Sequence, residues 1–271
     1  MYLCPRHSEF SLYLSVVFAQ NLQGIYWSHP EFEGRATWGE NFVGDALNTD
    51  SNGHGTHVAG IIGSKTYGVA KQTRLIAVKV LDASRAGNTT SVMQGIQWAV
   101  DDSKSREGCL DTSIINLSLG SLYSPTINAA VTAAAKQNLF VAVAAGNSGL
   151  PADTASPASA LEACTVGATD ISDTRATFSN WGSLVDVFAP GVNIVSTWSP
   201  DSATTPQTVG VLSGTSQAAA HVSGLGAYLM GLNAFNGSDT CRIIQELSTK
   251  DRVGNASLSK NYLAYNGLGV I

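Results

Sequence analysis

Short apolar runs alternate with helical patterns along the chain from residue 74 onward. The runs 74–80, 113–117 and 139–144 predict strands, and the segments 91–103 and 127–137 between them predict helices. Strands that alternate with helices form βαβ units, in which the strands are parallel and helices cover both faces of the sheet. The pattern therefore predicts an α/β fold with a mostly parallel central sheet.

Beyond residue 160 the pattern continues with short apolar runs and one long apolar helix. The strands are predicted at 164–168, 185–188 and 193–196, and the helix at 216–231. In an open parallel sheet, binding sites form beyond the carboxyl ends of the strands. We therefore expect a cleft beside residues 118–120, after the strand 113–117, and beside Asn147, after the strand 139–144.

The first twenty or so residues do not follow this pattern, and three interpretations are open. Arg6 followed by the apolar run 10–19 is compatible with a signal peptide. The alternating residues Leu12, Leu14, Val16 and Phe18 are compatible with a strand. The third interpretation, which we favour, is an incorrectly spliced or truncated start.

Composition excludes several classes of protein. The chain has 271 residues, 44% of them hydrophobic, which is enough for the core of a single α/β domain. Only 13% of the residues are charged and the net charge is −5, so a nucleic-acid partner is not expected. No apolar run reaches the roughly 18 residues that cross a membrane.

Cysteine usage and glycosylation triplets both fit an oxidising compartment. The four cysteines contain no CxxC pair, which argues against a zinc cage, and their even number is compatible with disulfides. Triplets for N-glycosylation begin at Asn88, Asn236 and Asn255, and are a weak signal for secretion.

Three short motifs carry residues that are typical of nucleophilic catalysis. Ser216 follows a Gly-Thr pair at the start of the long helix, where the helix N-terminus favours negative charge. His54 lies in a Gly-rich motif and can accept a proton near neutral pH. Asn147 follows an apolar strand. Together they offer a nucleophile, a general base and an oxyanion donor.

Each motif also has a plainer explanation. Ser216 could cap a helix, His54 could be structural and Asn147 could belong to a turn. A metal site of His54, His57 and His221 is disfavoured, because no carboxylate or cysteine ligand follows at a suitable spacing. An α/β-hydrolase esterase is disfavoured because Ser216 lacks the Gly-x-Ser-x-Gly elbow.

In this order the three motifs resemble those of the subtilisin-like serine proteases, and most closely the fungal proteinase K branch. The resemblance runs from about Gly24 to Asn266 and includes the segment 28–35. It implies a three-layer subtilisin-like fold, with a peptidase domain at 24–271 after an atypical segment at 1–23. It also implies a serine endopeptidase in which Ser216 is the nucleophile, His54 the base and Asn147 the oxyanion donor.

The resemblance further implies that a substrate peptide binds as an added strand between two segments of the enzyme. The corresponding substrate-binding residues are Arg85, Ala86, Gly87, Asn88, Thr89, Ser118, Leu119, Gly120, Ala144, Ala145 and Gly146. The small residues at 144–146 imply a broad preference for apolar or aromatic P1 side chains. Arg85 replaces the usual Gly, and either crowds the rim of the cleft or selects acidic substrate residues.

The family's catalytic Asp is missing from this chain. Its position, two residues before Gly24, is occupied by Leu22. The Asp orients the histidine and stabilises its protonated form, and in subtilisin its loss costs about 3 × 10⁴ in kcat. The neutral amides of Asn21 or Gln23 would orient His54 only in part. We therefore expect an impaired protease, with a catalytically inactive peptide-binding protein as the alternative.

Other expectations come from the resemblance alone. It implies a calcium ion held by the Asp186 carboxylate and the backbone oxygens of Leu161 and Ala163, unless Asp186 is an ordinary surface residue. It also implies a Cys164–Cys241 disulfide and a cis peptide bond at Ser156-Pro157. Cys109 would be free unless Cys4 reaches it. Gln217 stands where the family usually has Met, and Ala220 where it usually has Pro. Neither replacement rules out the mechanism.

The resemblance also implies partners and location. Substrates would be peptides and proteins, and an inhibitory pro-segment absent from this chain would be a further partner. A secreted monomer is expected, with no membrane attachment, no catalytic metal and no organic cofactor. His57 and His221 are expected to bond backbone carbonyls.

Overall fold

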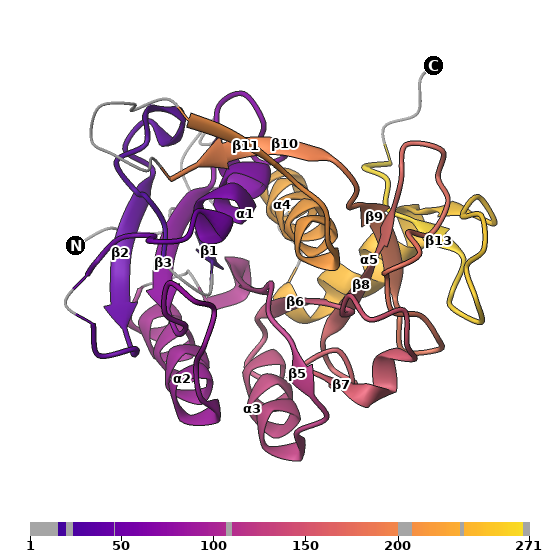
Figure 1. Cartoon of the computed structure of the whole chain (residues 1–271), viewed down its shortest axis with the longest axis horizontal. Helices are drawn as coiled ribbons and strands as arrows, with labels where there is room; N and C mark the ends of the chain where they lie inside the picture. Colours follow the sequence, from indigo (N-terminus) through magenta and orange to yellow (C-terminus); the bar gives the residue numbers. More distant parts are fainter. Residues whose placement is uncertain are drawn as a thin grey trace.

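The computed structural model describes residues 16–19, 24–45, 47–106, 110–199, 208–233 and 236–267. Nine strands within these residues form one sheet, in the order β12-β13-β9-β8-β6-β4-β1-β3-β2 (Figure 1). These strands are β1 Val16–Ala19, β2 Ala36–Asn41, β3 Arg74–Lys79, β4 Ser113–Leu117, β6 Phe140–Ala144, β8 Cys164–Thr169, β9 Val187–Pro190, β12 Thr249–Lys250 and β13 Tyr262–Leu263. All neighbouring pairs are parallel except β12 with β13, so the mostly parallel sheet is confirmed.

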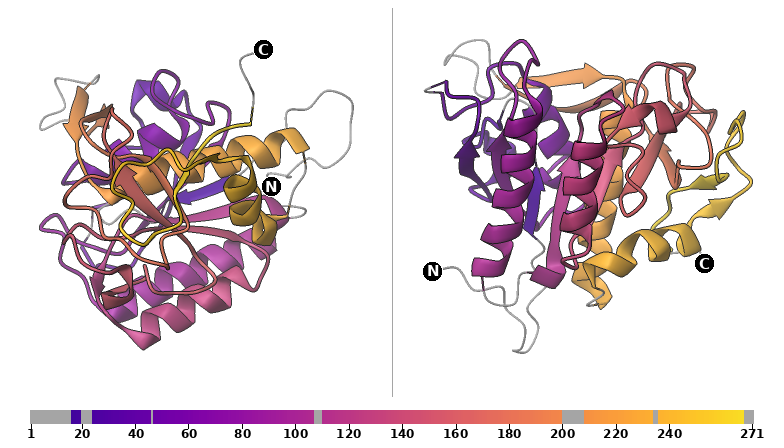
Figure 2. Two further views of the ribbon diagram at one scale, coloured as in Figure 1. Left: turned by 90° about the vertical axis from the view of Figure 1, so that its right-hand side faces the viewer. Right: turned by 90° about the horizontal axis from the view of Figure 1, so that it is seen from below.

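Helices cover both faces of this sheet, as Figure 2 shows from two further directions. The helices are α1 His54–Gly63, α2 Thr89–Ser105, α3 Pro125–Ala135, α4 Thr215–Asn233 and α5 Thr240–Leu247, with short 3-10 turns at Pro30–Phe32, Leu110–Thr112, Ala152–Thr154 and Gly237–Asp239. Three apolar clusters form the core of the described residues: one under α1 and α4, one under α2 and α3, and a smaller one that includes Ala145 and Phe188. This arrangement confirms the predicted three-layer α/β fold.

The central strands are short and fully buried because helices lie on both sides of them. Every residue of β4 and β6 is buried, including the polar Ser113 and Asn116 of β4, because helical layers cover both faces of the sheet. Because both strands end at the same edge of the sheet, Ser118 and Asn147, which follow them, come to lie on one cleft.

One predicted strand lies outside the central sheet. The segment predicted at 193–196 forms β10 Ile194–Trp198, which pairs antiparallel with β11 Thr208–Leu212 in a separate two-stranded ribbon. In β11, intermediate and exposed residues alternate, because this ribbon has no helix layer over its outer face. A second small ribbon pairs β5 Ser121–Leu122 with β7 Ala155–Ser156.

The short strand β1 belongs to the atypical N-terminal segment. Its backbone pairs in parallel with β3 on one side and with β4 on the other, so it occupies the middle of the sheet. This agrees with the strand interpretation for Val16–Ala19. Leu22, and with it the position of the family's Asp, lies outside the described residues.

Two local expectations are confirmed. A disulfide joins Cys164 at the start of β8 to Cys241 in α5. The Ser156-Pro157 peptide bond is cis. Cys4 and Cys109 lie outside the described residues, so the expectation for them stays a prediction. None of the described helices combines the length and apolar character needed to span a bilayer.

Candidate active site

A cleft of about 490 Å³ opens where β4, β6, α1 and α4 meet. The predicted nucleophile Ser216, the predicted base His54 and the predicted oxyanion donor Asn147 all line it. Its other lining residues are Leu81, Arg85, Ser118, Leu119, Gly120, Ser121, Leu122, Ala144, Gly146, Ser148, Leu150, Thr154, Ala155, Asn180, Leu212, Ser213, Gly214, Thr215 and Gln217. Three motifs that are far apart in the sequence therefore meet at one surface.

Ser216 lies in the first turn of α4 and is 8% exposed. Its Oγ donates to the carbonyl oxygen of Ser118 at 3.3 Å, and Ser118 Oγ donates to the carbonyl oxygen of Ser216 at 2.9 Å. Ser118 Oγ also accepts from Asn116 Nδ2, at 3.0 Å. This reciprocal pairing fixes the start of α4 against the end of β4, so the hydroxyl of Ser216 is held at the floor of the cleft.

Asn147 is oriented by Thr215. Its Oδ1 accepts from the backbone N–H of Thr215 at 2.8 Å and from Thr215 Oγ at 2.9 Å. Because a backbone N–H can only donate, the carbonyl end of the Asn147 amide must face Thr215. The Nδ2 of Asn147 makes no hydrogen bond with any described residue, which leaves this donor available to the cleft. Sequence reasoning did not identify Thr215 as the residue that orients it.

Asn180 shapes the small-residue wall of the cleft and was also missed. Its Nδ2 donates to the carbonyl of Ala145 at 2.9 Å, and its Oδ1 accepts from the N–H groups of Ser148 and Leu150 at 3.1 Å. Gly146 has φ = 106°, and a Cβ at this position would lie 2.3 Å from Asn180 Nδ2. Only glycine fits there. Ala145 itself is buried behind the wall and does not line the cleft.

Asp50 holds the helix that carries His54. Its carboxylate accepts from the backbone N–H groups of Asn52, Gly53 and Thr56 and from Thr56 Oγ, at 2.7–2.9 Å. The first N–H groups of a helix have no partner within the helix, so this buried carboxylate caps α1. An Asp just before a Gly-rich helix start is a capping signal that sequence reasoning could have used.

His54 is buried, and its ring lacks the partner that a catalytic histidine normally has. Its Nδ1 is buried with no hydrogen-bond partner, and neither ring nitrogen bonds to a residue that the structure describes. Burial, followed by the neighbouring charges of Arg85 and His57, lowers the pKa of His54 to about 3. The ring is therefore neutral near pH 7, with nothing in the described chain to fix its tautomer.

The other two histidines of the sequence motifs bond backbone carbonyls, as expected. The ring of His57 bonds Ile194 O at 2.9 Å, and the ring of His221 bonds Gln217 O at 2.9 Å. Among the described residues, the one cluster of three potential ligand side chains, Cys164, Asp186 and Cys241, contains no histidine, and its two cysteines are joined in a disulfide. The alternative metal site of three histidines therefore has no support.

Arg85 is the one charged side chain among the described residues that line the cleft, His54 being neutral. Its backbone has φ = 69°, a conformation that favours glycine. Its side chain is exposed and makes no ion pair with a described residue. Ala86, Gly87, Asn88 and Thr89 do not line the cleft, because the chain turns away into α2, where Asn88 Oδ1 accepts from Ser91 N–H.

The two replacements in α4 differ in their exposure to the cleft. Gln217 lines the cleft, is 1% exposed, and its Nε2 is buried without a hydrogen-bond partner. Ala220 is fully buried in the core under α4. The Gln217 amide thus adds an unsatisfied donor beside Ser216, while Ala220 only contributes to packing.

The calcium site implied by the resemblance can be tested on Asp186. Structural calcium is general in the subtilase family. Here Asp186 Oδ1 accepts from Lys260 Nζ at 2.8 Å and from Gln245 Nε2 at 2.9 Å, and Oδ2 accepts from the N–H of Thr165 at 3.0 Å. A calcium ion needs about six to eight oxygen ligands without a competing cation. As they stand, these residues do not fit a calcium ion.

Comparisons with known proteins agree with this geometry. The model of the subtilase family (Peptidase_S8) matches residues 23–262. The cuticle-degrading protease of Metarhizium anisopliae is 47% identical over 249 residues, covering 90% of this chain and 61% of that protein. Proteinase T of Parengyodontium album is 47% identical over 247 residues, covering 91% and 82% respectively.

A solved structure extends the comparison. The crystal structure of a cold adapted subtilisin-like serine proteinase matches with a TM-score of 0.84 and 34% identity, covering 98% of this chain and 95% of that one. A subtilisin-like protease of Coccidioides posadasii is 49% identical over 91% of this chain, which spans 60% of that relative's length. On the family match and these similarities, the chain belongs to the subtilase family of serine proteases.

Proposed function

We propose that this chain is a serine endopeptidase of impaired activity, with Ser216 as nucleophile and His54 as general base. The proposal is supported above all by the meeting of Ser216, His54 and Asn147 on one cleft, with the Asn147 amide turned so that Nδ2 is free. These are the groups that acyl transfer requires.

The proposed chemistry uses only groups of this chain. Ser216 Oγ attacks the scissile carbonyl carbon while His54 takes its proton, and the resulting oxyanion accepts from the Ser216 N–H and Asn147 Nδ2. The C–N bond then breaks as His54 gives the proton to the leaving amine. Water, deprotonated by His54, hydrolyses the acyl-enzyme and releases Ser216.

The environment of His54 supports the impairment. In a complete triad a carboxylate accepts from Nδ1–H of the histidine and stabilises the imidazolium that forms during the reaction. Here burial and nearby charges lower the pKa of His54 to about 3, and its Nδ1 has no partner in the described chain. A base with so low a pKa is a weak proton acceptor, because the efficiency of a general base decreases as its basicity decreases.

A restoration experiment tests this proposal. A chain with a family-like first strand carrying Leu22→Asp should cleave apolar-P1 peptides about 10³–10⁵ times faster, the reverse of the known loss. The gain should disappear in the same chain with Ser216→Ala and after treatment with a serine-directed reagent. A folded, restored protein that still cleaves nothing would contradict the proposed activity.

The unpartnered His54 also favours a second candidate function, that of a catalytically inactive peptide-binding protein. This candidate keeps the cleft and the free donors but has no turnover. It predicts that peptides bind with similar affinity before and after Ser216→Ala, and that restoring Asp at position 22 leaves the cleavage rate at the background level.

Substrate preference follows from the walls of the cleft. Ala144 and Gly146 leave room for apolar or aromatic P1 side chains, and the unpaired charge of Arg85 would attract an acidic residue elsewhere in the substrate. Peptides and proteins are the proposed substrates, and an inhibitory pro-segment a proposed further partner. The disulfide supports a secreted protein. The calcium expectation at Asp186 is not part of this proposal, because the carboxylate is already paired with Lys260.

A further inference from the structure

Asp186 lies where four parts of the chain meet, outside the cleft. It precedes β9, and its backbone N–H donates to Thr165 O while its Oδ2 accepts from Thr165 N–H in β8. Its Oδ1 accepts from Gln245 in α5 and from Lys260 in the C-terminal segment. The Cys164–Cys241 disulfide is adjacent, with both sulfur atoms within 4.8 Å of the carboxylate. The Asp186 carboxylate, just before β9, therefore connects β8, α5 and the C-terminal segment through hydrogen bonds.

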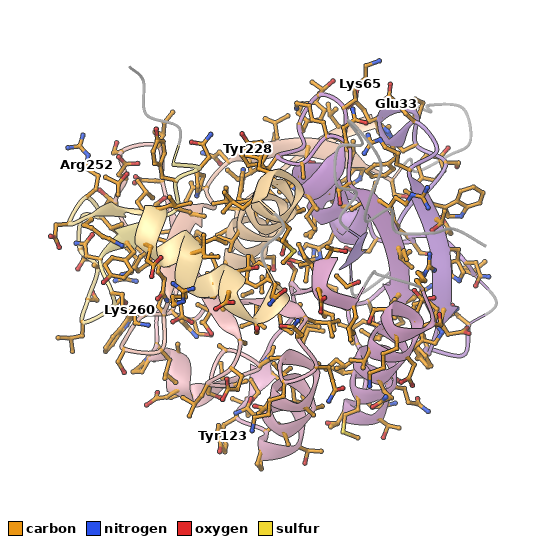
Figure 3. The ribbon with its side chains drawn as sticks, turned by 180° about the vertical axis from the view of Figure 1, so that it is seen from behind. Glu33, Lys65, Tyr123, Tyr228, Arg252 and Lys260 are labelled. Carbon is orange, nitrogen blue, oxygen red and sulfur yellow. A yellow bond between two sulfur atoms is a disulfide. The ribbon has the colours of Figure 1, made fainter. Side chains whose placement is uncertain are left out.

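The backbone brings Lys260 to this carboxylate. β13 pairs with β9 through Leu263 and Phe188, so the residues that precede these two strands start side by side. Lys260 comes from the segment before β13 and Asp186 from the segment before β9. Figure 3 shows Lys260 on the side of the molecule formed by the C-terminal residues. The side chain of Asp186 is 18% exposed and that of Lys260 is 42% exposed, so the pair is partly shielded from water.

The Lys260 ammonium and a calcium ion would compete for the same oxygen of the Asp186 carboxylate. An ammonium 2.8 Å from Oδ1 repels a second positive charge at that oxygen. The remaining candidate ligands are the backbone oxygens of Leu161 and Ala163, in the turn that leads into β8. Without the carboxylate, two neutral carbonyls make a poor calcium site.

We propose that the Lys260 ammonium takes the place of a calcium ion at Asp186, so that this corner of the fold is held together by the chain itself. The positive charge, the link to the C-terminal segment and the neutralisation of Asp186 are all supplied by one side chain. The stability of the chain is then insensitive to calcium at Asp186, Leu161 and Ala163. Replacing Lys260 by a neutral residue removes the competing cation from the carboxylate and creates calcium dependence.

Thermal unfolding of four purified chains tests this: the unchanged chain, Lys260→Met, Asp186→Asn and Lys136→Met. Lys136 is a matched control because it is a lysine without an ion pair to a described residue. Each melting temperature is measured in millimolar calcium chloride and in excess EDTA. The unchanged chain and Lys136→Met should shift by less than about 1 °C between the two. Lys260→Met should melt several degrees lower in EDTA and recover at least about 3 °C with calcium.

Asp186→Asn separates this site from calcium bound elsewhere, because it should melt lower and show no calcium response at the site. Equilibrium dialysis of calcium against the folded unchanged chain and Asp186→Asn gives a second readout that does not depend on the Lys260 variant folding. Equal calcium stoichiometry in the two chains is the expected result. The proposal is overturned if the unchanged chain binds one more calcium ion than Asp186→Asn, or if calcium fails to stabilise folded Lys260→Met.

Discussion

At the scale of single residues, the hydroxyl of Thr215 has a role that the cleft depends on. It donates to Asn147 Oδ1 and accepts from the N–H of Gly146 at 3.1 Å, so it fixes the amide that would bind the oxyanion. Thr215→Val should lower kcat about tenfold in the Leu22→Asp background and leave KM nearly unchanged, because an oxyanion donor acts only in the transition state.

Steady-state kinetics on one apolar-P1 peptide measures this effect. Thr132→Val, on the helix α3 away from the cleft, is the matched control and should leave both constants unchanged. A rise in KM with an unchanged kcat would mean that Thr215 contributes to substrate binding and not to orientation of Asn147.

Arg85 leads to a prediction about substrate charge. It is the single charged side chain of the described cleft lining, and it is exposed, so its attraction for a carboxylate is that of a surface ion pair. In the Ser216→Ala chain, a peptide with Glu on the Arg85 side should bind about two to five times more tightly than its Gln counterpart. The difference should fade at high salt, because exposed charges are screened.

Fluorescence anisotropy with the two labelled peptides gives the dissociation constants. Arg85→Gln should abolish the difference, whereas Arg252→Gln, an exposed arginine on the C-terminal part of the chain, should preserve it. Equal affinities for both peptides in the unchanged cleft would favour steric crowding by Arg85 over charge selection.

Residues of the candidate site that stand in local sequence motifs could be predicted, whereas those that act through long-range contacts could not. Ser216 and His54 stand in motifs whose local features, a helix start and flanking glycines, are visible in the sequence. Asn180 and Thr215 act on groups more than 30 residues away, through contacts such as those to Ala145 and Gly146. Single-sequence reasoning cannot see such contacts, because only the completed fold brings these partners together.

At the scale of elements, the cap of α1 determines the placement of His54. Asp50 is 2% exposed and accepts four hydrogen bonds, so Asp50→Ala leaves three backbone N–H groups, two of them buried, without a partner. The loss should lower the free energy of unfolding by about 3 kcal/mol. The melting temperature should fall by about 6–12 °C for a chain of this size.

Thermal unfolding followed by circular dichroism measures this change. The matched control is Asp170→Ala, because Asp170 accepts comparable bonds from Ser172 and Thr174 in a less buried turn. It should cost no more than about 1 kcal/mol. Equal losses in the two variants would show that burial of the Asp50 cap adds nothing to its value.

Elements buried on both faces were predicted well, and those at the periphery were not. The run that forms β6 is apolar throughout, and in β4 Ile114, Ile115 and Leu117 are apolar, so the burial of both strands could be predicted from the sequence. The segment 193–196, with Ile194 and Val195 at its centre, forms the start of β10, which pairs with β11 in a ribbon outside the sheet. Which partner a short strand chooses depends on tertiary packing, which local composition does not encode.

At the scale of the whole molecule, buried histidines make stability depend on pH. Burial lowers the pKa of His54 to about 3 and that of His57 to about 4, against about 6.5 when unfolded. The unfolded chain therefore binds more protons than the folded chain. The stability that the two neutral histidines contribute is present above about pH 6.5. It is lost as the pH falls toward about 4 for His57 and about 3 for His54. At pH 5 the two histidines together should lower the free energy of unfolding by about 4 kcal/mol relative to pH 8.

Melting temperatures between pH 8 and pH 5 measure this loss. His57→Gln, which keeps a hydrogen-bond donor for the Ile194 carbonyl, should remove about half of the fall that His54 and His57 cause together. An identical fall in the variant and the unchanged chain would assign the pH dependence to other titrating groups, such as the buried His29 and His221, whose pKa values burial also lowers.

The position of β1 has a consequence for the order of events during synthesis. The strand β1 is synthesised before both of its partners, yet in the finished sheet it lies between β3 and β4, paired with residues 74–77 on one side and 113–116 on the other. At about 5–20 residues per second, the second partner emerges roughly 5–20 s after the first strand. Until then the apolar strand β1 has no β4 to pair with, and the centre of the sheet is incomplete. The central part of the sheet can therefore be completed only after β4, the later of the two partners of β1, has been synthesised.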